Sequence, residues 1–456
     1  MLKTYTMRIT RILTVFLFPM LALPVYGQNQ HTVEQIRLSL DEAIQIAQER
    51  GFSSRIAYQE IEQSGSLLVQ TRSAFLPSIS IEETAVRTTD PVGVFGIRLR
   101  QGIATAADFN PAALNAPDPI GNFTTRFQIQ QPIFNPESIM QRSVAKQQFE
   151  SSKKQYRSVQ QHTILTVKEL YTNALILDRQ LQVLNRYLVA SSALEQQASD
   201  YYEQGIISKA EYLSTQVQRV SAEQHLIRAK NQRKAANDEL TLALGYEKEM
   251  EVVVSDGLQW DMLATGQMAE VPTAGPPAEI QALAHQVEAS KHRVRASRSG
   301  FLPSLHVFGN YELHDNSIFG NQADNYTIGA NLRWDLFKGF RQVGKIAERK
   351  AELRKVELVY EQRLAAHHAQ VREVRRQVDE AQKNIELSNL AVEQAKEDAR
   401  IRNDRYTEGI EKTSDLLSAE ARLLENELNH LKATFQWYVS IARLEYLLET
   451  EFISNK

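Results

Sequence analysis

Two very long stretches without glycine or proline constrain how this chain can fold. The first covers residues 137–204 and the second residues 345–408. At about 1.5 Å per residue, a helix over the first stretch would be roughly 100 Å long. Such a helix far exceeds the usual length in a globular domain, so it must be supported along its side by other helices.

The spacing of apolar residues in both stretches indicates side-by-side helix packing. They step by alternating fours and threes, the heptad period of supercoiled helices. The first stretch carries Leu170, Ala174, Leu177, Leu181, Leu184 and Leu188. The second carries Val371, Val374, Val378, Ala381, Ile385, Ser388, Val392, Ala395 and Ala399, with Leu387, Leu390 and Ala391 on another face. A helix with two apolar seams has neighbours on both sides.

A glycine-containing sequence ends each long stretch. YYEQGIISKAEYLSTQ (residues 201–216) is echoed by RYTEGIEKTSDLLSAE (residues 405–420) at a constant shift of 204 positions. Gly205 and Gly409 interrupt the helices and permit a left-handed cap. Further helices are predicted over residues 208–244 and from the second glycine to about residue 450. The turn is therefore one copy of an internal repeat.

Strand pairs occupy the same place in both repeats. TRSAFLPSISI (residues 71–81) matches SRSGFLPSLHV (residues 297–307), and both lead from helix into alternating apolar and polar residues. In the first repeat, strands are predicted over residues 75–88 and from Phe123 to a stop at Pro132, joined by a loop over residues 90–122. That loop is longer than its counterpart in the second repeat by about 23 residues, because the repeat shift falls from 226 to 203 across it.

The alternation gives the predicted strands two different faces. Thr, Asn, Gln, Arg and Glu gather on one face, and the other carries Phe123, Phe127, Ile129, Tyr326, Ile328, Leu332 and Trp334. This is the pattern of a membrane β-barrel with lipid outside and water inside. Four strands cannot close a barrel, but three chains would supply twelve.

The first residues read as a secretory signal peptide over residues 1–27. Lys3, Arg8 and Arg11 precede an apolar run at residues 12–23, which is shorter than the approximately 20 residues of a membrane anchor. Translation from either Met1 or Met7 fits this pattern. Removal of the signal shifts the formal net charge from −3 to −6, which argues against nucleic acid as a partner.

The mature chain divides into two repeats and a linker. The first repeat is residues 28–245, the linker is 246–277, and the second repeat is 278–456. Each repeat reads as helix, two strands, very long helix, glycine break and helix. In LSLDEAIQIAQER (residues 38–50), Ser39 and Glu42 predict a capping box at the start of the first helix.

In this order, LSLDEAI, AEIQALAHQVEASKHRVRASRSGFLPSL (residues 278–305) and the two Y-x-x-G-I turns resemble the TolC-like family of outer-membrane efflux proteins. The resemblance covers nearly the whole mature chain. It implies a mostly α-helical protein with membrane β-structure: a homotrimer whose 12-stranded barrel continues into a long periplasmic helical barrel. It also implies an exit duct in the outer membrane of a Gram-negative bacterium, serving a tripartite efflux pump or a type I secretion system. The implied partners are a periplasmic adaptor, an inner-membrane transporter and outer-membrane lipid.

The resemblance also assigns roles to the glycine turns. In such ducts adaptors dock at the far periplasmic tips, which gives Gly205, Ile206, Ser208, Gly409, Ile410 and Thr413 as candidate contacts. The alternative is that only the fold requires the repeated turn. Three residues, Glu211, Tyr406 and Asp415, match positions of the periplasmic gate in this family. Each of them could instead lie on a solvated helix face. Two positions depart from the family pattern: Glu411 stands where a gating arginine is expected, and Ser418 where a second aspartate is expected.

No motif in the sequence predicts an enzyme. There is no cysteine, HExxH, P-loop, GxGxxG or GxSxG, and the adjacent His367 and His368 point in different directions on a helix. We therefore predict no catalytic, cofactor or metal site. The rival to the duct is a periplasmic coiled-coil structural or adaptor protein whose strands form a small soluble sheet. In that case the apolar strand face would lie in a protein core.

Overall fold

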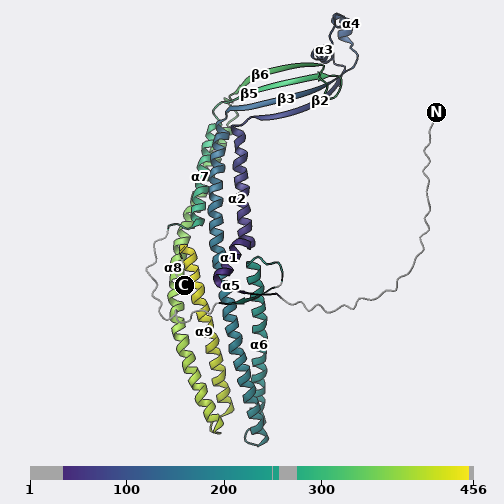
Figure 1. Ribbon diagram of the computed structural model, residues 1–456. Coiled ribbons are helices and arrows are strands. Elements are labelled where there is room, and N and C mark those ends of the chain that lie inside the picture. The colour runs from purple at the N-terminus through teal and green to yellow at the C-terminus, as the bar shows by residue number, and fades with distance from the viewer. Residues whose placement is uncertain (1–33, 249, 256–274, 451–456) are drawn as a thin grey trace, which may run out of the picture.

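The computed structural model describes residues 34–248, 250–255 and 275–450, so the predicted signal peptide lies outside the described residues. The molecule is elongated. A β-sheet lies at one end, helices run away from it, and two helical turns lie at the other end (Figure 1). None of the helices within these residues combines the length and apolar composition needed to cross a bilayer.

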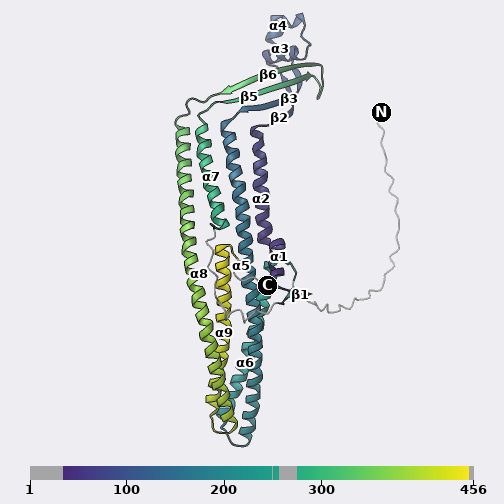
Figure 2. The ribbon, with the colours of Figure 1, turned by 60° about the vertical axis from the view of Figure 1, so that its left-hand side comes forward.

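The two long helices predicted from the sequence are confirmed. Helix α5 spans Pro136–Glu203 and helix α8 spans Arg341–Thr407. Both run from the sheet to the far turns (Figure 2). The seams are also found: Ala174 and Leu184 of α5 and Val378 of α8 are almost fully buried. On the second face of α8, Leu387 is 64% exposed and Leu390 is 50% exposed.

Shorter helices are stacked in pairs beside the long ones. Helix α2 (Phe52–Gln70) lies above α6 (Lys209–Ala243), and α7 (Ala278–Ser299) lies above α9 (Thr413–Leu448) (Figure 2). Each stacked pair therefore covers the distance that one long helix covers unbroken. The predicted bounds of α6 and α9 agree with these to within a few residues.

A small parallel sheet crosses the helices at mid-length. Strand β1 (Glu34–Leu38) pairs with β4 (Met250–Val254), and α1 (Leu40–Arg50) follows β1. The sequence analysis predicts only the four strands of the large sheet and misses this second sheet, in which β4 comes from the segment treated as linker. The side chain of Asn237 acts as a third strand: its amide donates to Met250 O (2.6 Å), and its oxygen accepts from Val252 N (2.8 Å).

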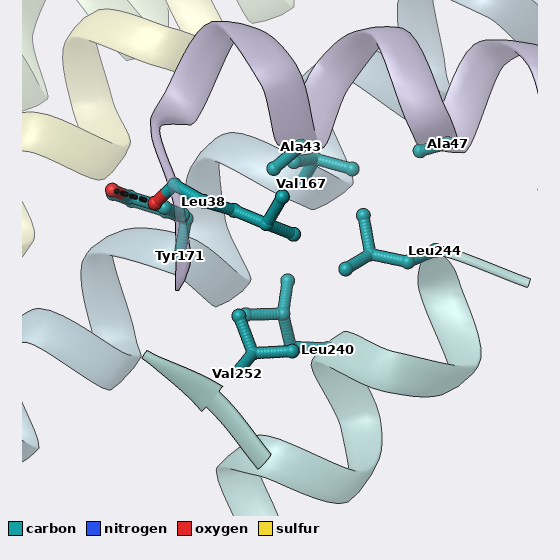
Figure 3. Close-up of a cluster of buried hydrophobic side chains, with 8 residues drawn as sticks. All are labelled: Leu38, Ala43, Ala47, Val167, Tyr171, Leu240, Leu244 and Val252. Carbon is teal, nitrogen blue, oxygen red and sulfur yellow. Dashed lines mark hydrogen bonds between the residues drawn. The ribbon is translucent and has the colours of Figure 1, made fainter. Parts of the chain in front are cut away.

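Apolar side chains of β1, α1, α5, α6 and β4 pack together at this small sheet (Figure 3). The hydroxyl of Tyr171, in α5, donates to the carbonyl of Leu38 at 3.0 Å. The predicted capping box of Ser39 and Glu42 is present and starts α1 beside the cluster. The buried members of the cluster are Leu38, Ala43, Ala47, Val167, Tyr171, Leu240, Leu244 and Val252.

The large sheet has four antiparallel strands in the order β2-β3-β5-β6. These are β2 (Ser78–Thr88), β3 (Ile120–Phe134), β5 (Ser304–Asp315) and β6 (Ala323–Arg333), and a 3₁₀ turn, η1 (Thr71–Ala74), precedes β2. Strand β3 continues past Pro132, contrary to prediction. Its register with β5 shifts between Pro132 and Phe134, as expected at a residue that lacks an N–H donor.

The segment between β2 and β3, residues 89–119, is called here the insert, and its prediction as a loop is wrong. It contains α3 (Pro91–Arg100), a 3₁₀ turn η2 (Ala106–Phe109) and α4 (Pro111–Asn115). Proline stands in the first turn of both α-helices, where its missing N–H costs nothing. The glycines and prolines of this segment suggest a loop, but Gly93 and Gly96 lie inside α3.

Candidate functional site

The turn between α5 and α6 and the turn between α8 and α9 lie at the same end of the molecule (Figures 1 and 2). The rings of Tyr201, from the first hairpin, and Tyr406, from the second, are in contact at 5.8 Å between centroids. The two copies of the repeat therefore build one composite surface, called here the tip.

The glycines of the tip adopt the backbone conformation that the sequence predicts. Gly205 has φ 72° and Gly409 has φ 76°. In each turn the amide of the next residue donates to the carbonyl four residues before the glycine, at 2.9 Å for Ile206 and 3.0 Å for Ile410. This is a Schellman cap, and a side chain at either glycine would strain it.

Three of the four predicted contact side chains are accessible at the tip. Ile206 is 58% exposed and Ile410 is 61% exposed, and Ser208 is also exposed. Thr413 is only 1% exposed, so in this conformation its side chain cannot touch a partner. The two isoleucines occupy the same position in the two repeats, so they present equivalent apolar contacts.

The helices that leave the two turns start differently. Ser208 caps α6 through a capping box, in which the Glu211 carboxylate accepts from Ser208 N at 2.8 Å. The backbone and side-chain hydrogen bonds from Ser208 hold the pKa of Glu211 below its ordinary value. Lys412 stands at the matching position of α9 and makes no cap. The exposed Asp415 therefore has a carboxylate that is not tied to a helix start as that of Glu211 is.

Tyr406 lies between the hairpins. It is 2% exposed and in contact with Tyr201 of α5, and burial raises the pKa of its phenol. The matching residue of the first repeat, Tyr202, instead stacks on Tyr212 within its own hairpin, at 5.6 Å and nearly parallel. Movement of one hairpin against the other would separate Tyr406 from Tyr201 and leave the Tyr202–Tyr212 stack intact.

A chain of ion pairs joins α8 to α9 just above the second turn. Glu411 accepts from Arg402 and from Arg405, each at 2.9 Å, and its side chain is 10% exposed. Arg402 also binds Asp398 at 2.9 Å, and Asp398 binds Arg422 of α9 at 2.8 Å. These arginines lower the pKa of Asp398, the bond to Arg422 most. Glu411, at the position where an arginine is expected, is therefore compensated by two arginines on the preceding helix.

Sequence reasoning missed most of this ion-pair chain. The sequence analysis singles out Glu411 but assigns it no cation, and it assigns no role to Asp398 or Arg422. A usable signal was present: Asp398 and Arg402 are four residues apart, the spacing of a helical ion pair. The pairing across helices could not be read, because it depends on how α8 and α9 are rotated.

At the other end of the molecule, the predicted apolar strand residues share one face of the sheet. The strand register places Ile129, Tyr311 and Ile328 on this face. Phe123 is half-buried, and Trp334, just beyond β6, donates its indole N–H to Phe301 O at 3.0 Å. Exposed fractions in this set are 41% for Phe127, 46% for Ile129, 75% for Tyr326 and Ile328, 66% for Leu332 and 60% for Trp334.

The opposite face of the sheet carries paired polar groups. Arg126 of β3 binds Glu312 of β5 at 2.7 Å and approaches Glu82 of β2 at 3.7 Å. Near the end remote from the helices, Asn122 and Thr124 lie against the fully buried His314. One sheet thus has one face suited to lipid and one suited to water, as the alternation predicts.

Comparison with known protein families and sequences shows which family the chain belongs to. The family model described as outer membrane efflux protein matches residues 43–246 and 277–449. A curated relative, the alkaline protease secretion protein AprF of Pseudomonas aeruginosa, is 22% identical over 335 residues, covering 71% of this chain and 69% of that protein.

Solved structures share the fold over almost the whole chain. CusC, whose structures concern folding and transmembrane channel formation, has a TM-score of 0.76 at 14% identity and covers 94% of this chain and 96% of its own. The outer membrane protein VceC of Vibrio cholerae has a TM-score of 0.72 at 16% identity, with 91% and 97% covered.

Proposed function

We propose that this chain, which belongs to the outer membrane efflux protein family, assembles with two further copies of itself into the exit duct of an export machine. Membership in the family establishes the general function of the protein and its location in the cell. The protein is an efflux duct in the outer membrane of a Gram-negative bacterium, and its helical part extends into the periplasm. A periplasmic coiled-coil adaptor is not favoured. The assembly, its partners and its gate are the proposal.

The observation that carries the trimer is the open, two-faced sheet. Within the described residues, β2 and β6 are edge strands of a four-stranded sheet, and open edges of this length are a liability in water. Pairing β6 of one copy with β2 of the next closes twelve strands. The exposed Ile328 then faces lipid, and Arg126 and Glu312 face the lumen.

The helices support the same arrangement. Among the residues that the structure describes, Leu387 and Leu390 on the second seam of α8 are 64% and 50% exposed, and Ile56 and Leu67 of α2 are at least half exposed. A second copy would cover these side chains. Three chains then continue the barrel downward as a tube of helices, with three tips at its lower end.

The tip is the surface where we place the contacts with a periplasmic adaptor. Ile206 and Ile410 are exposed, equivalent and fixed by Schellman caps, so we assign them as adaptor contacts, with Gly205 and Gly409 shaping the turns. Glu211, Tyr406 and Asp415 remain the proposed gate. The duct itself is passive, and an inner-membrane transporter supplies the energy. The system is a tripartite efflux pump or a type I secretion system, the latter being the kind of role that the name of AprF describes.

Neighbouring substitutions on β6 test the assembly. Ile328→Lys puts a charge on the apolar face, and we expect it to abolish trimers in the outer membrane, because a lysine facing hydrocarbon costs about 2–4 kcal/mol per chain at the bilayer midplane. Thr327→Lys, one residue away on the polar face, should assemble normally. Equal assembly of both variants, or recovery of the unaltered chain as a periplasmic monomer, would refute the duct.

A further inference from the structure

We infer that the insert, residues 89–119, is a rigid ledge over the polar face of the sheet which, in three copies, narrows the outer opening of the duct and limits the size of what passes. This rests on the proposed trimeric duct. It concerns the end of the molecule opposite to the tip, where α3 and α4 lie beyond the strands (Figures 1 and 2).

Contacts within the insert hold its helices together. Asp90 caps α3 by accepting from Gly93 N at 2.6 Å. Arg98 of α3 forms an ion pair with Asp108 of η2, whose carboxylate also accepts from Thr105 N at 2.7 Å. The rings of Phe95 and Phe109 meet edge to face at 5.3 Å. These contacts tie α3 to η2, so the insert is a folded unit.

The insert is also fastened to the sheet. Gln101, at the end of α3, is 2% exposed and donates to Gly121 O at 3.0 Å and to Asn122 Oδ1 at 2.9 Å. Asn122 in turn contacts the buried His314 of β5 at 3.3 Å. Val94 and Ile97 of α3 are buried as well. Unpairing these groups would be costly, so the insert is held in one place.

The residues that attach the insert to the sheet show on which face of the sheet it lies. Asn122 and His314 lie on the polar face, and Arg100 acts electrostatically on His314 and Glu312 of that face. A side chain at Gly102 would lie 3.9 Å from Ala323 of β6, also on the polar face. From β3 to β6 is two strand spacings, roughly 10 Å. The end of α3 and the residues just after it therefore lie against the water-facing side of the sheet. Helix α4 projects from there away from the strands (Figures 1 and 2).

In a threefold-symmetric trimer, three inserts would narrow the outer opening of the lumen. If the polar face lines the lumen, each chain's insert projects over the lumen from its own third of the wall. The short connection between β5 and β6, residues 316–322, contributes no comparable structure. Val92, Leu99 and Phe109 are 81%, 52% and 61% exposed on the insert, and they give the opening an apolar rim.

Single cysteines test this, because the natural chain has none. We would introduce Thr327→Cys on the polar face and treat intact cells with a small membrane-impermeant maleimide or with the same maleimide on a bulky hydrophilic polymer. We expect the small reagent to label and the bulky one to be excluded. Replacing residues 89–119 by residues 316–322 should abolish this exclusion, and Gln101→Ala, which only unfastens the insert, should weaken it.

Labelling by the small reagent reports assembly of each variant. A bulky reagent that labels Thr327→Cys equally with and without the insert would overturn the inference. Ile328→Cys separates that failure from failure of the duct itself. Lipid should protect it from both reagents in a true barrel, whereas rapid labelling there would mean that the sheet does not face lipid.

Discussion

The carboxylate of Glu449 accepts a hydrogen bond from the backbone N–H of Ala278, so the end of α9 caps the start of α7. Glu449 has a left-handed φ of 47°, and the same position of the first repeat, 204 residues earlier, is Gly245 with φ 81°. At Gly245 a Cβ would lie 2.4 Å from Arg50 O. The two repeats thus solve the same helix-to-helix junction differently, by close backbone contact in one and by a side-chain cap in the other.

We predict that Glu449→Ala destabilises the helical part by about 1–3 kcal/mol, because the N-terminus of α7 loses its cap and Arg157 loses an ion pair at 3.0 Å. Thermal unfolding of the purified protein followed by circular dichroism measures this. Glu386→Ala is the control, since its pair with Lys383 is exposed and worth about 0.5 kcal/mol at most. Equal effects would show that the junction does not depend on Glu449.

The two helix starts at the tip should respond oppositely to substitution. Ser208→Ala removes the cap of α6 and should lower amide-exchange protection of its first turn by about 0.5–2 kcal/mol, whereas Lys412→Ser should raise protection of the first turn of α9 by a similar amount. Hydrogen exchange with mass spectrometry reads both. No change in α9 would mean that Asp415 and its neighbours already satisfy that helix start.

The cap of α6 should also depend on pH. Hydrogen bonds from Ser208 lower the pKa of Glu211 in the folded state, so the stabilisation is fully present above the ordinary glutamate value and is lost as pH falls through the lowered value. Protection factors at Tyr212, corrected for intrinsic exchange, should therefore fall only in acid. Glu211→Gln should remove this dependence, and its persistence would assign the effect to another group.

Cross-linking tests whether the tip opens by moving one hairpin against the other. Cysteines at Tyr201 and Tyr406, joined by a short bifunctional reagent, should block export, because those rings meet between hairpins. Cysteines at Tyr202 and Tyr212, joined in the same way, should leave export intact, because that pair lies within one hairpin. Equal loss of export in both would show that the Tyr201–Tyr406 contact has no special part in opening.

The ion pairs of Glu411 should hold the second hairpin together. Glu411→Arg places a third positive charge beside Arg402 and Arg405 and should loosen the turn, raising single-channel conductance in planar bilayers. Double replacement of Arg402 and Arg405 by glutamine in the Glu411→Arg background should reverse part of the increase. If conductance is unchanged by Glu411→Arg, the ion pairs do not restrict the tip.

Most of the fold could be predicted because its signals are local. The uninterrupted runs that become α5 and α8, the glycines at 205 and 409 and the strand alternation each leave a pattern within a short window. Strands β1 and β4 left none, since each has five residues and pairs with a partner more than 200 positions away. The insert misled because Gly93 and Gly96 lie inside α3, where tertiary contacts override a weak helix propensity.

The site was predictable to a lesser degree for the same reason. The internal repeat located the two turns and the strand alternation located the sheet face, but neither predicted the burial of Thr413 or the pairing of Glu411. Both depend on how two hairpins rotate against each other, which the sequence of either one does not contain. The departure at Glu411 was visible as an anomaly, and only the structure supplied its partners.

The most direct test of the duct is electron microscopy of the untagged protein extracted from outer membranes in mild detergent. We predict a hollow particle with threefold symmetry, in which a tube of about 100 Å extends from a detergent belt. A soluble rod, or a particle without threefold symmetry, would contradict the account, because the open sheet and the exposed helix seams would then have another explanation.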